Sequence, residues 1–300
     1  FCPSSCSINL RLQMSEDKSN TNWHVLLARL LQLILEHLNV QVLSDVQLLT
    51  DPPKADILLI RRESSEWTEE QRRWLADGLR HTDAGHLLIE FKYTESLTFS
   101  ALRQLMAYDY FYCEVGKRSL EDVACFLIVA KTPQGDWCNK FGFTATEWPG
   151  VYQGSEIFTK RIKILLLNEL ESTPHNAALK CFATKRKERD AAFATMSSSG
   201  LESLSFSIEK LVNGLRRIFM SHTLQVDELT PDRVMELGQE LMDAVLKYAP
   251  LEKILSYHKP DEILSHYQPN TILNHYKPEQ RLAGLTEEQI RAYLEKIKKS

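Results

Sequence analysis

The segment from His86 to Tyr93, HLLIEFKY, constrains the fold more than any other part of the chain, because it sets two opposite charges into an otherwise apolar run. Successive side chains of a β-strand point to opposite faces of the sheet. In a strand, Leu88, Glu90 and Lys92 therefore share one face, and the apolar residues that alternate with them share the other. The pattern predicts a strand that holds a carboxylate and an ammonium group together on one face.

The sequence around this strand predicts further strands and helices in alternation. A helix rich in leucine is expected from Trp23 to Leu38, and a polar helix is expected after Thr68, which forms a capping-box pattern with Gln71. A third helix is expected from Thr98 to Tyr112. Apolar or alternating runs predict strands over 40–49, 56–60, 123–130, 151–158 and 162–167. This order predicts an α/β fold, a mixed β-sheet flanked by helices.

Beyond Glu171 the strand-like runs end and helix formers dominate. The tail carries a short repeat in which each copy begins with proline, which suits the first turn of a helix. Repeats of this kind suggest a scaffold or a partner surface. The predicted organisation is a disordered or artefactual N-terminus over 1–22, a core over 23–171, an all-α region over 172–249 that includes a linker at 197–200, and short Pro-initiated helical repeats over 250–300.

Composition limits the classes of function. The formal net charge is -4, so any contact with a polyanion must come from local basic patches. The most apolar stretch is too short and too polar to span a bilayer, so no membrane association is expected. Six cysteines without a CxxC pair are typical of reduced thiols, which places the protein in the cytoplasm.

The charged residues of two neighbouring strands suggest a chemistry. Asp56 leads one apolar run and Glu90 lies within another, and Mg²⁺ prefers hard carboxylate oxygens while it keeps several waters. Lys92 projects from the same face as Glu90, where it can orient or help deprotonate an attacking water and stabilise a pentavalent phosphate. Gln104 and Tyr108 lie four residues apart on one helical face and can reach the same site.

The sequences PPKAD ending at Asp56, IEFK ending at Lys92 and QLMAY ending at Tyr108 together resemble the PD-(D/E)xK nuclease superfamily. With the proline-initiated tail, the chain is similar to the Rpn-type recombination-promoting and transposase-like nucleases. The resemblance implies a restriction-endonuclease-like core and a Mg²⁺- or Mn²⁺-dependent DNA endonuclease linked to recombination or mobile elements. It implies that Asp56 and Glu90 bind the metal and that Lys92 is catalytic, with Gln104 and Tyr108 in support.

The same resemblance implies a glutamate in the first helix that assists the metal, and Glu36 is the candidate. Several alternatives stay open. An E-x-K pair by itself is most often a solvated strand face. The basic cluster at 185–189 either contacts phosphates or is a solvated helix face, since acidic residues interrupt it. A homodimer is compatible with double-strand cleavage. The alternative function is an inactive nuclease-fold scaffold that binds partners through its repeats.

Overall fold

A computed structural model describes residues 22–47, 54–61, 66–200, 205–220, 229–248, 264–265 and 268–298. By their internal contacts the residues form two compact units, 1–243 and 244–300. Among the helices of the described ranges, none combines the length and the apolar character needed to cross a membrane.

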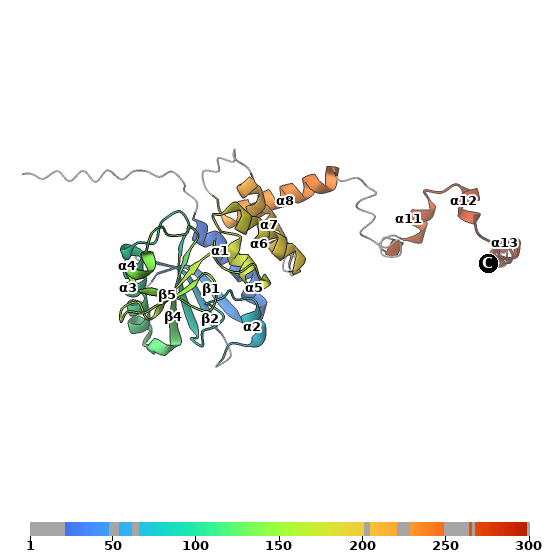
Figure 1. The fold of residues 1–300 in the computed structure, drawn as a ribbon. Coiled ribbons are helices and arrows are strands. Elements are labelled where there is room, and N and C mark those ends of the chain that lie inside the picture. Colours follow the sequence, from blue (N-terminus) through green and yellow to red (C-terminus); the bar gives the residue numbers. More distant parts are fainter. Residues whose placement is uncertain are drawn as a thin grey trace, which may run out of the picture. The chain divides into compact units, whose positions relative to one another are not determined.

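The first unit is built on a seven-stranded mixed sheet (Figure 1). In space the strands follow the order β1-β2-β3-β4-β7-β6-β5, and β4 pairs in parallel with both β3 and β7, whereas the other pairs are antiparallel. The strands are β1 (Val40–Gln47), β2 (Lys54–Arg61), β3 (His86–Lys92), β4 (Val123–Val129), β5 (Phe143–Ala145), β6 (Val151–Gly154) and β7 (Ile162–Leu166). The predicted mixed sheet with flanking helices is confirmed at this level.

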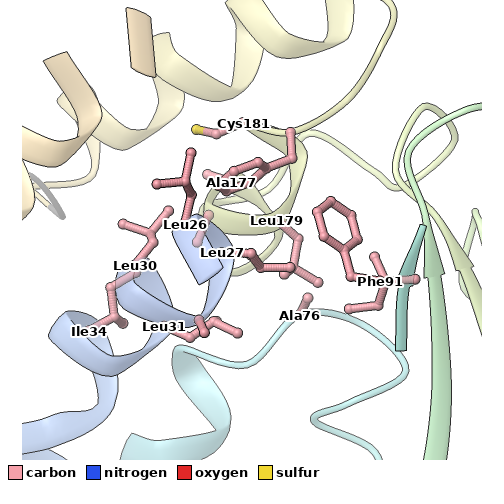
Figure 2. Close-up of a cluster of buried hydrophobic side chains, with 14 of the residues drawn as sticks. Leu26, Leu27, Leu30, Leu31, Ile34, Ala76, Phe91, Ala177, Leu179 and Cys181 are labelled. Atoms are coloured by element: carbon pink, nitrogen blue, oxygen red, sulfur yellow. The ribbon is translucent and has the colours of Figure 1, made fainter. Parts of the chain in front are cut away.

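Helix α1 (Trp23–Leu35) covers one face of the sheet. Its leucines recur at helical spacing, and the helix gives way to a short 3-10 turn (Glu36–Leu38) that ends at Asn39 in the left-handed conformation. Figure 2 shows side chains of α1 reaching toward Leu179 and Phe91. Phe91 and the alternating apolar residues of β3 lie in this core, as the period of two predicts.

Helix α3 (Phe99–Gly116) covers the opposite face. Thr98 caps its first turn by accepting a hydrogen bond from the Ala101 amide. Leu102, Leu105 and Tyr108 pack there in one core that includes Leu88 of β3. The two faces of β3 therefore enter two separate cores, and Glu90 and Lys92 lie on the α3 side.

Several boundaries differ from the sequence predictions. Helix α2 (Glu69–Arg73) is shorter than expected, although Thr68 and Gln71 form the predicted capping box. Strand β6 ends at Gly154, four residues early. Helix α4 (Trp137–Phe141) and strand β5 were not predicted, because both are too short to show a period. The expected linker at 197–200 is wrong in its first half, since Ser197 and Ser198 complete helix α6.

The helices after the sheet are α5 (Pro174–Lys180), α6 (Arg186–Ser198), α7 (Phe206–Met220) and α8 (Pro231–Tyr248). Helix α5 is anchored to the loop after α2, where Asp77 accepts hydrogen bonds from Asn176 Nδ2 at 2.7 Å and His175 Nε2 at 3.0 Å. Apolar residues of α5, α6, α7 and α8 belong to the core that contains α1. These helices therefore pack with α1 on the same face of the sheet and form a helical layer there.

In the second unit the structure describes α11 (Pro269–Leu273), α12 (Pro278–Leu282) and α13 (Glu287–Lys298). Pro269 and Pro278 each start a helix, as the repeat pattern predicts. Most of the two earlier copies, which begin at Pro250 and Pro260, lies outside the described residues, and so does the predicted N-terminal segment except Asn22.

Candidate functional site

Asp56 lies where β2 and β3 stop pairing. The antiparallel register runs from Ile60 opposite His86 to Ile57 opposite Ile89. One residue further, Oδ2 of Asp56 accepts a hydrogen bond of 2.8 Å from the backbone amide of Phe91. The carboxylate thus accepts the hydrogen bond that a backbone carbonyl of the neighbouring strand would accept in a regular β-sheet. This bond fixes the carboxylate at the point where β2 and β3 stop pairing.

Glu90 follows the last residue of β3 that pairs with β2, and it is almost fully buried, with 1% of its side chain exposed. Its Oε1 contacts the ammonium nitrogen of Lys92 at 2.8 Å. Its Oε2 is buried and has no hydrogen-bond partner among the described residues. A buried carboxylate oxygen without a partner is costly, so the site as it stands favours either a proton or a cation at this atom.

The electrostatics of the two carboxylates agree with this conclusion. Burial and the negative charge of Asp56 raise the pKa of Glu90 to about 7. Burial also raises the pKa of Asp56, against the hydrogen bond from Phe91 and the positive charge of His24. The charge of Asp56 therefore makes ionisation of Glu90 less favourable, and a divalent cation between the two carboxylates would reverse this effect.

Lys92 lies between Glu90 and Glu95, with its nitrogen 2.8 Å from the first carboxylate and 3.3 Å from the second. Burial by itself would lower the pKa of Lys92, but the charge and hydrogen bond of Glu90 raise it above its ordinary value. The amine therefore stays protonated at neutral pH. It can act as a fixed cation and as a proton donor, but it is a poor base.

Helix α3 adds Gln104 and Tyr108. Nε2 of Gln104 donates a hydrogen bond to the phenol oxygen of Tyr108, which is buried. Burial raises the pKa of Tyr108, and the negative charges of Glu90 and Asp56 raise it further, so the phenol lies within electrostatic reach of both carboxylates. The structure thus brings together five of the six residues that the sequence singled out.

Glu36 is the exception. The site meets the first turn of α1, where Trp23 and His24 line a cavity of about 170 Å³ together with Asp56 and Lys92. Glu36 follows the other end of α1, roughly 18 Å along the axis from His24 at 1.5 Å per residue, and its side chain is exposed. The expectation that Glu36 assists a metal at this site therefore does not fit the structure.

Two residues near the site were missed by the sequence reasoning. Nε2 of His24 lies 3.1 Å from Oδ1 of Asp45, and the charges of both residues influence Asp56. Asp45 adopts the left-handed backbone conformation, with φ at 51°, at the point where the register of β1 and β2 skips one pair. An aspartate tolerates this conformation, and such positions concentrate near functional sites. No spacing in the sequence connects these residues to Asp56.

The donor set suits a hard cation with few protein ligands. Within the described residues there is no group of three or more His, Cys, Asp or Glu side chains that could enclose a metal ion. Asp56 and Glu90 provide two carboxylates, which is the number that Mg²⁺ commonly takes from a protein while it keeps its waters. Zn²⁺ would require four ligands in a structural site, or three in a catalytic site, and fits less well.

Comparison with known proteins identifies no relative. No known protein family, no curated protein and no solved structure matches the chain. The interpretation of the site therefore depends on its own geometry.

Proposed function

We propose that the chain is a metal-dependent endonuclease that hydrolyses phosphodiester bonds of DNA at the site formed by Asp56, Glu90 and Lys92. The observation that carries the proposal is the unpartnered Oε2 of Glu90, buried next to a second carboxylate and beside a protonated lysine. We further propose that the order α1-β1-β2-β3-α3-β4 corresponds to a restriction-endonuclease-like core.

In this mechanism Asp56 and Oε2 of Glu90 would hold Mg²⁺ or Mn²⁺. The bound metal would supply positive charge against the phosphate oxygens and a more acidic water. Lys92, fixed by Oε1 of Glu90, would orient the attacking water and stabilise the negative charge that develops on the phosphate. The phenol of Tyr108, held by Gln104, would add a hydrogen-bond donor on the α3 side.

The test is nicking of supercoiled plasmid by the purified protein with Mg²⁺ or Mn²⁺, compared with the variants Asp56→Ala, Lys92→Ala and Glu36→Gln. Circular dichroism establishes that each variant is folded. We expect cleavage by the wild type and by Glu36→Gln, which serves as a control outside the site, and loss of cleavage in the other two. Removal of one transition-state donor or charge typically costs about 10²- to 10³-fold in rate.

Two other outcomes would contradict the proposal in different ways. Equal cleavage by all four proteins would indicate a contaminant or another site. No cleavage by any of them would favour the scaffold function, in which the described helices α11 to α13 and the rest of the tail bind a partner.

A further inference from the structure

A cleft between α6 and α7 collects three arginines from two separate helices. Its volume is about 380 Å³. Its lining residues are Arg186, Arg189, Asp190 and Phe193 of α6 and Arg216, Phe219 and Met220 of α7. We call it the arginine cleft. Arg186 and Arg189 belong to the basic cluster that the sequence left undecided, and Arg216 joins them only through the fold.

Aromatic rings fix two of the guanidinium groups. Arg189 lies over the ring of Phe219 at 4.2 Å, and Arg216 lies over that of Phe193 at 5.3 Å. A guanidinium that stacks on a ring is held in place and keeps its full positive charge, which suits it to attract phosphate groups. Arg216 also donates hydrogen bonds to Oγ of Ser197 at 2.6 Å, to the carbonyl oxygen of Phe193 at 2.9 Å and to Oδ1 of Asn213 at 3.0 Å, so it contributes a fixed positive charge to the cleft.

The charge balance of the arginine cleft is positive. Arg186 is 82% exposed, and its Nε lies 3.3 Å from Oδ2 of Asp190, the acidic residue of the lining. Glu188, which interrupts the basic cluster in the sequence, is held instead by Lys180 at 2.9 Å. Three arginines therefore face one aspartate, although the net charge of the chain is negative.

A continuous stack of side chains connects the arginine cleft to the candidate active site. Phe219, under Arg189, stacks on Trp23 at 5.5 Å between ring centroids, and Trp23 stacks on Tyr93 at 4.1 Å. Trp23 and Tyr93 also line the small cavity that contains Asp56. The positive charge of Arg189 opposes the rise that burial causes in the pKa of Tyr93, which agrees with this proximity.

We infer that the arginine cleft binds backbone phosphates of the nucleic acid whose scissile bond lies at Asp56 and Glu90. The inference rests on the proposed function and adds the path of the substrate strand. The chain of contacts from Arg189 to Tyr93 is as long as a few nucleotides, because successive phosphates of one DNA strand lie about 3.4 Å apart along the helix axis. Trp23 already stacks on two rings, those of Phe219 and Tyr93, so we assign the contact to phosphates and not to stacked bases.

The experiment measures binding separately from cleavage. A fluorescent DNA oligonucleotide is titrated with the full chain in EDTA, and the dissociation constant is followed by anisotropy over a range of salt concentrations. The variants are Arg186→Glu and Asp190→Asn in the cleft and Arg73→Glu as the matched control. Arg73 is an exposed arginine of α2, and Gln71 of α2 donates a hydrogen bond to the carbonyl oxygen of Leu38, in the 3-10 turn after the far end of α1.

The inference predicts changes of opposite sign for the two cleft variants. Arg186→Glu should weaken binding about tenfold and reduce the slope of log K against log salt by about one, the effect of one lost phosphate contact. Asp190→Asn should tighten binding, because the competing anion is gone, and Arg73→Glu should behave like the wild type. Plasmid cleavage at low protein concentration should fall with Arg186→Glu and recover when the protein concentration is raised.

The failures of the two proposals can be distinguished. If the wild type binds and cuts DNA while Arg186→Glu and Arg73→Glu bind equally well, the inference about the cleft is overturned and the nuclease remains. If poly-glutamate competes as well as DNA, the assignment to phosphates is overturned. If the wild type binds no DNA in EDTA, the inference about the cleft is overturned, and the nicking assay with Mg²⁺ or Mn²⁺ decides the nuclease separately.

Discussion

The ammonium nitrogen of Lys92 lies 2.8 Å from Oε1 of Glu90, two residues earlier on the same strand, and this contact gives the two oxygens of one carboxylate different surroundings. Oε1 is neutralised by the lysine, whereas Oε2 is buried without a partner among the described residues. One oxygen of this carboxylate therefore has neither a hydrogen-bond donor nor a neutralising charge beside it within the described residues. Changes in pH or metal concentration, and substitutions of Glu90, should therefore have measurable effects.

The first prediction concerns stability against pH. The pKa of Glu90 is about 7 in the folded chain, against an ordinary value of 4.5. Below 4.5 the folded and unfolded chains both carry this proton, and between 4.5 and 7 only the folded chain does. The free energy of unfolding should therefore fall by roughly 3 kcal/mol as pH rises through this window. Thermal unfolding in EDTA should show this fall for the wild type and a smaller one for Glu90→Gln.

The control for this measurement is Glu95→Gln, which removes an exposed carboxylate that also contacts Lys92. Its melting temperature should follow the wild type across the whole pH range. Parallel curves for the wild type and Glu90→Gln would show that Glu90 does not titrate with a raised pKa.

The second prediction concerns the metal. A cation that binds only the folded chain raises the free energy of unfolding, by about 2.7 kcal/mol at a concentration a hundredfold above Kd. The melting temperature rises with it. Mg²⁺ should stabilise the wild type and Glu36→Gln but not Asp56→Asn. The stabilisation should be smaller at acidic pH, because Glu90 must release its proton before it can bind the ion. Stabilisation of Asp56→Asn equal to that of the wild type would place the ion elsewhere.

The third prediction separates the phenol of Tyr108 from its ring. Tyr108→Phe keeps the packing against Leu105 and removes the oxygen that Gln104 contacts. Cleavage should fall about tenfold, the contribution of one hydrogen bond of about 1.4 kcal/mol, while stability changes by about 1 kcal/mol or less. Tyr110→Phe, on the exposed side of the same helix, should change neither quantity. A loss of stability without a loss of rate would give Tyr108 a purely structural role.

The main features of the sheet could be predicted from the sequence because they depend on local periods. The alternation around Glu90 places Leu87 and Phe91 in one core and Leu88 in the other, as the structure has them. Elements with only three to five residues, such as β5 and α4, carry no such period.

The surroundings of the site could not be predicted in the same way. His24, Asp45 and Asp56 meet because α1, β1 and β2 pack together, and no spacing along the chain encodes that contact. The same reasoning explains the error at Glu36. The sequence indicated a helix but not which of its ends faces the strands, and the structure brings His24 to the site instead.

The last prediction tests the support of the arginine cleft. Helices α7 and α8 cross at Gly214 and Gly238, so closely that a Cβ at Gly238 would lie 1.8 Å from the carbonyl oxygen of Lys210. Alanine would favour the helical state of α8 by about 1 kcal/mol. The clash is with backbone, however, so the helices must separate, at a typical cost of about 1–3 kcal/mol or more. We expect the steric effect to prevail and Gly238→Ala to lower the melting temperature.

Gln239→Ala, one residue further on α8, is the matched control and should leave the melting temperature nearly unchanged. Because α7 carries Arg216 and Phe219, Gly238→Ala should also weaken DNA binding in EDTA at a temperature where the variant remains folded. If Gly238→Ala is as stable as the wild type, the two helices do not cross at this distance. If it is less stable but binds DNA normally, the cleft does not depend on this crossing.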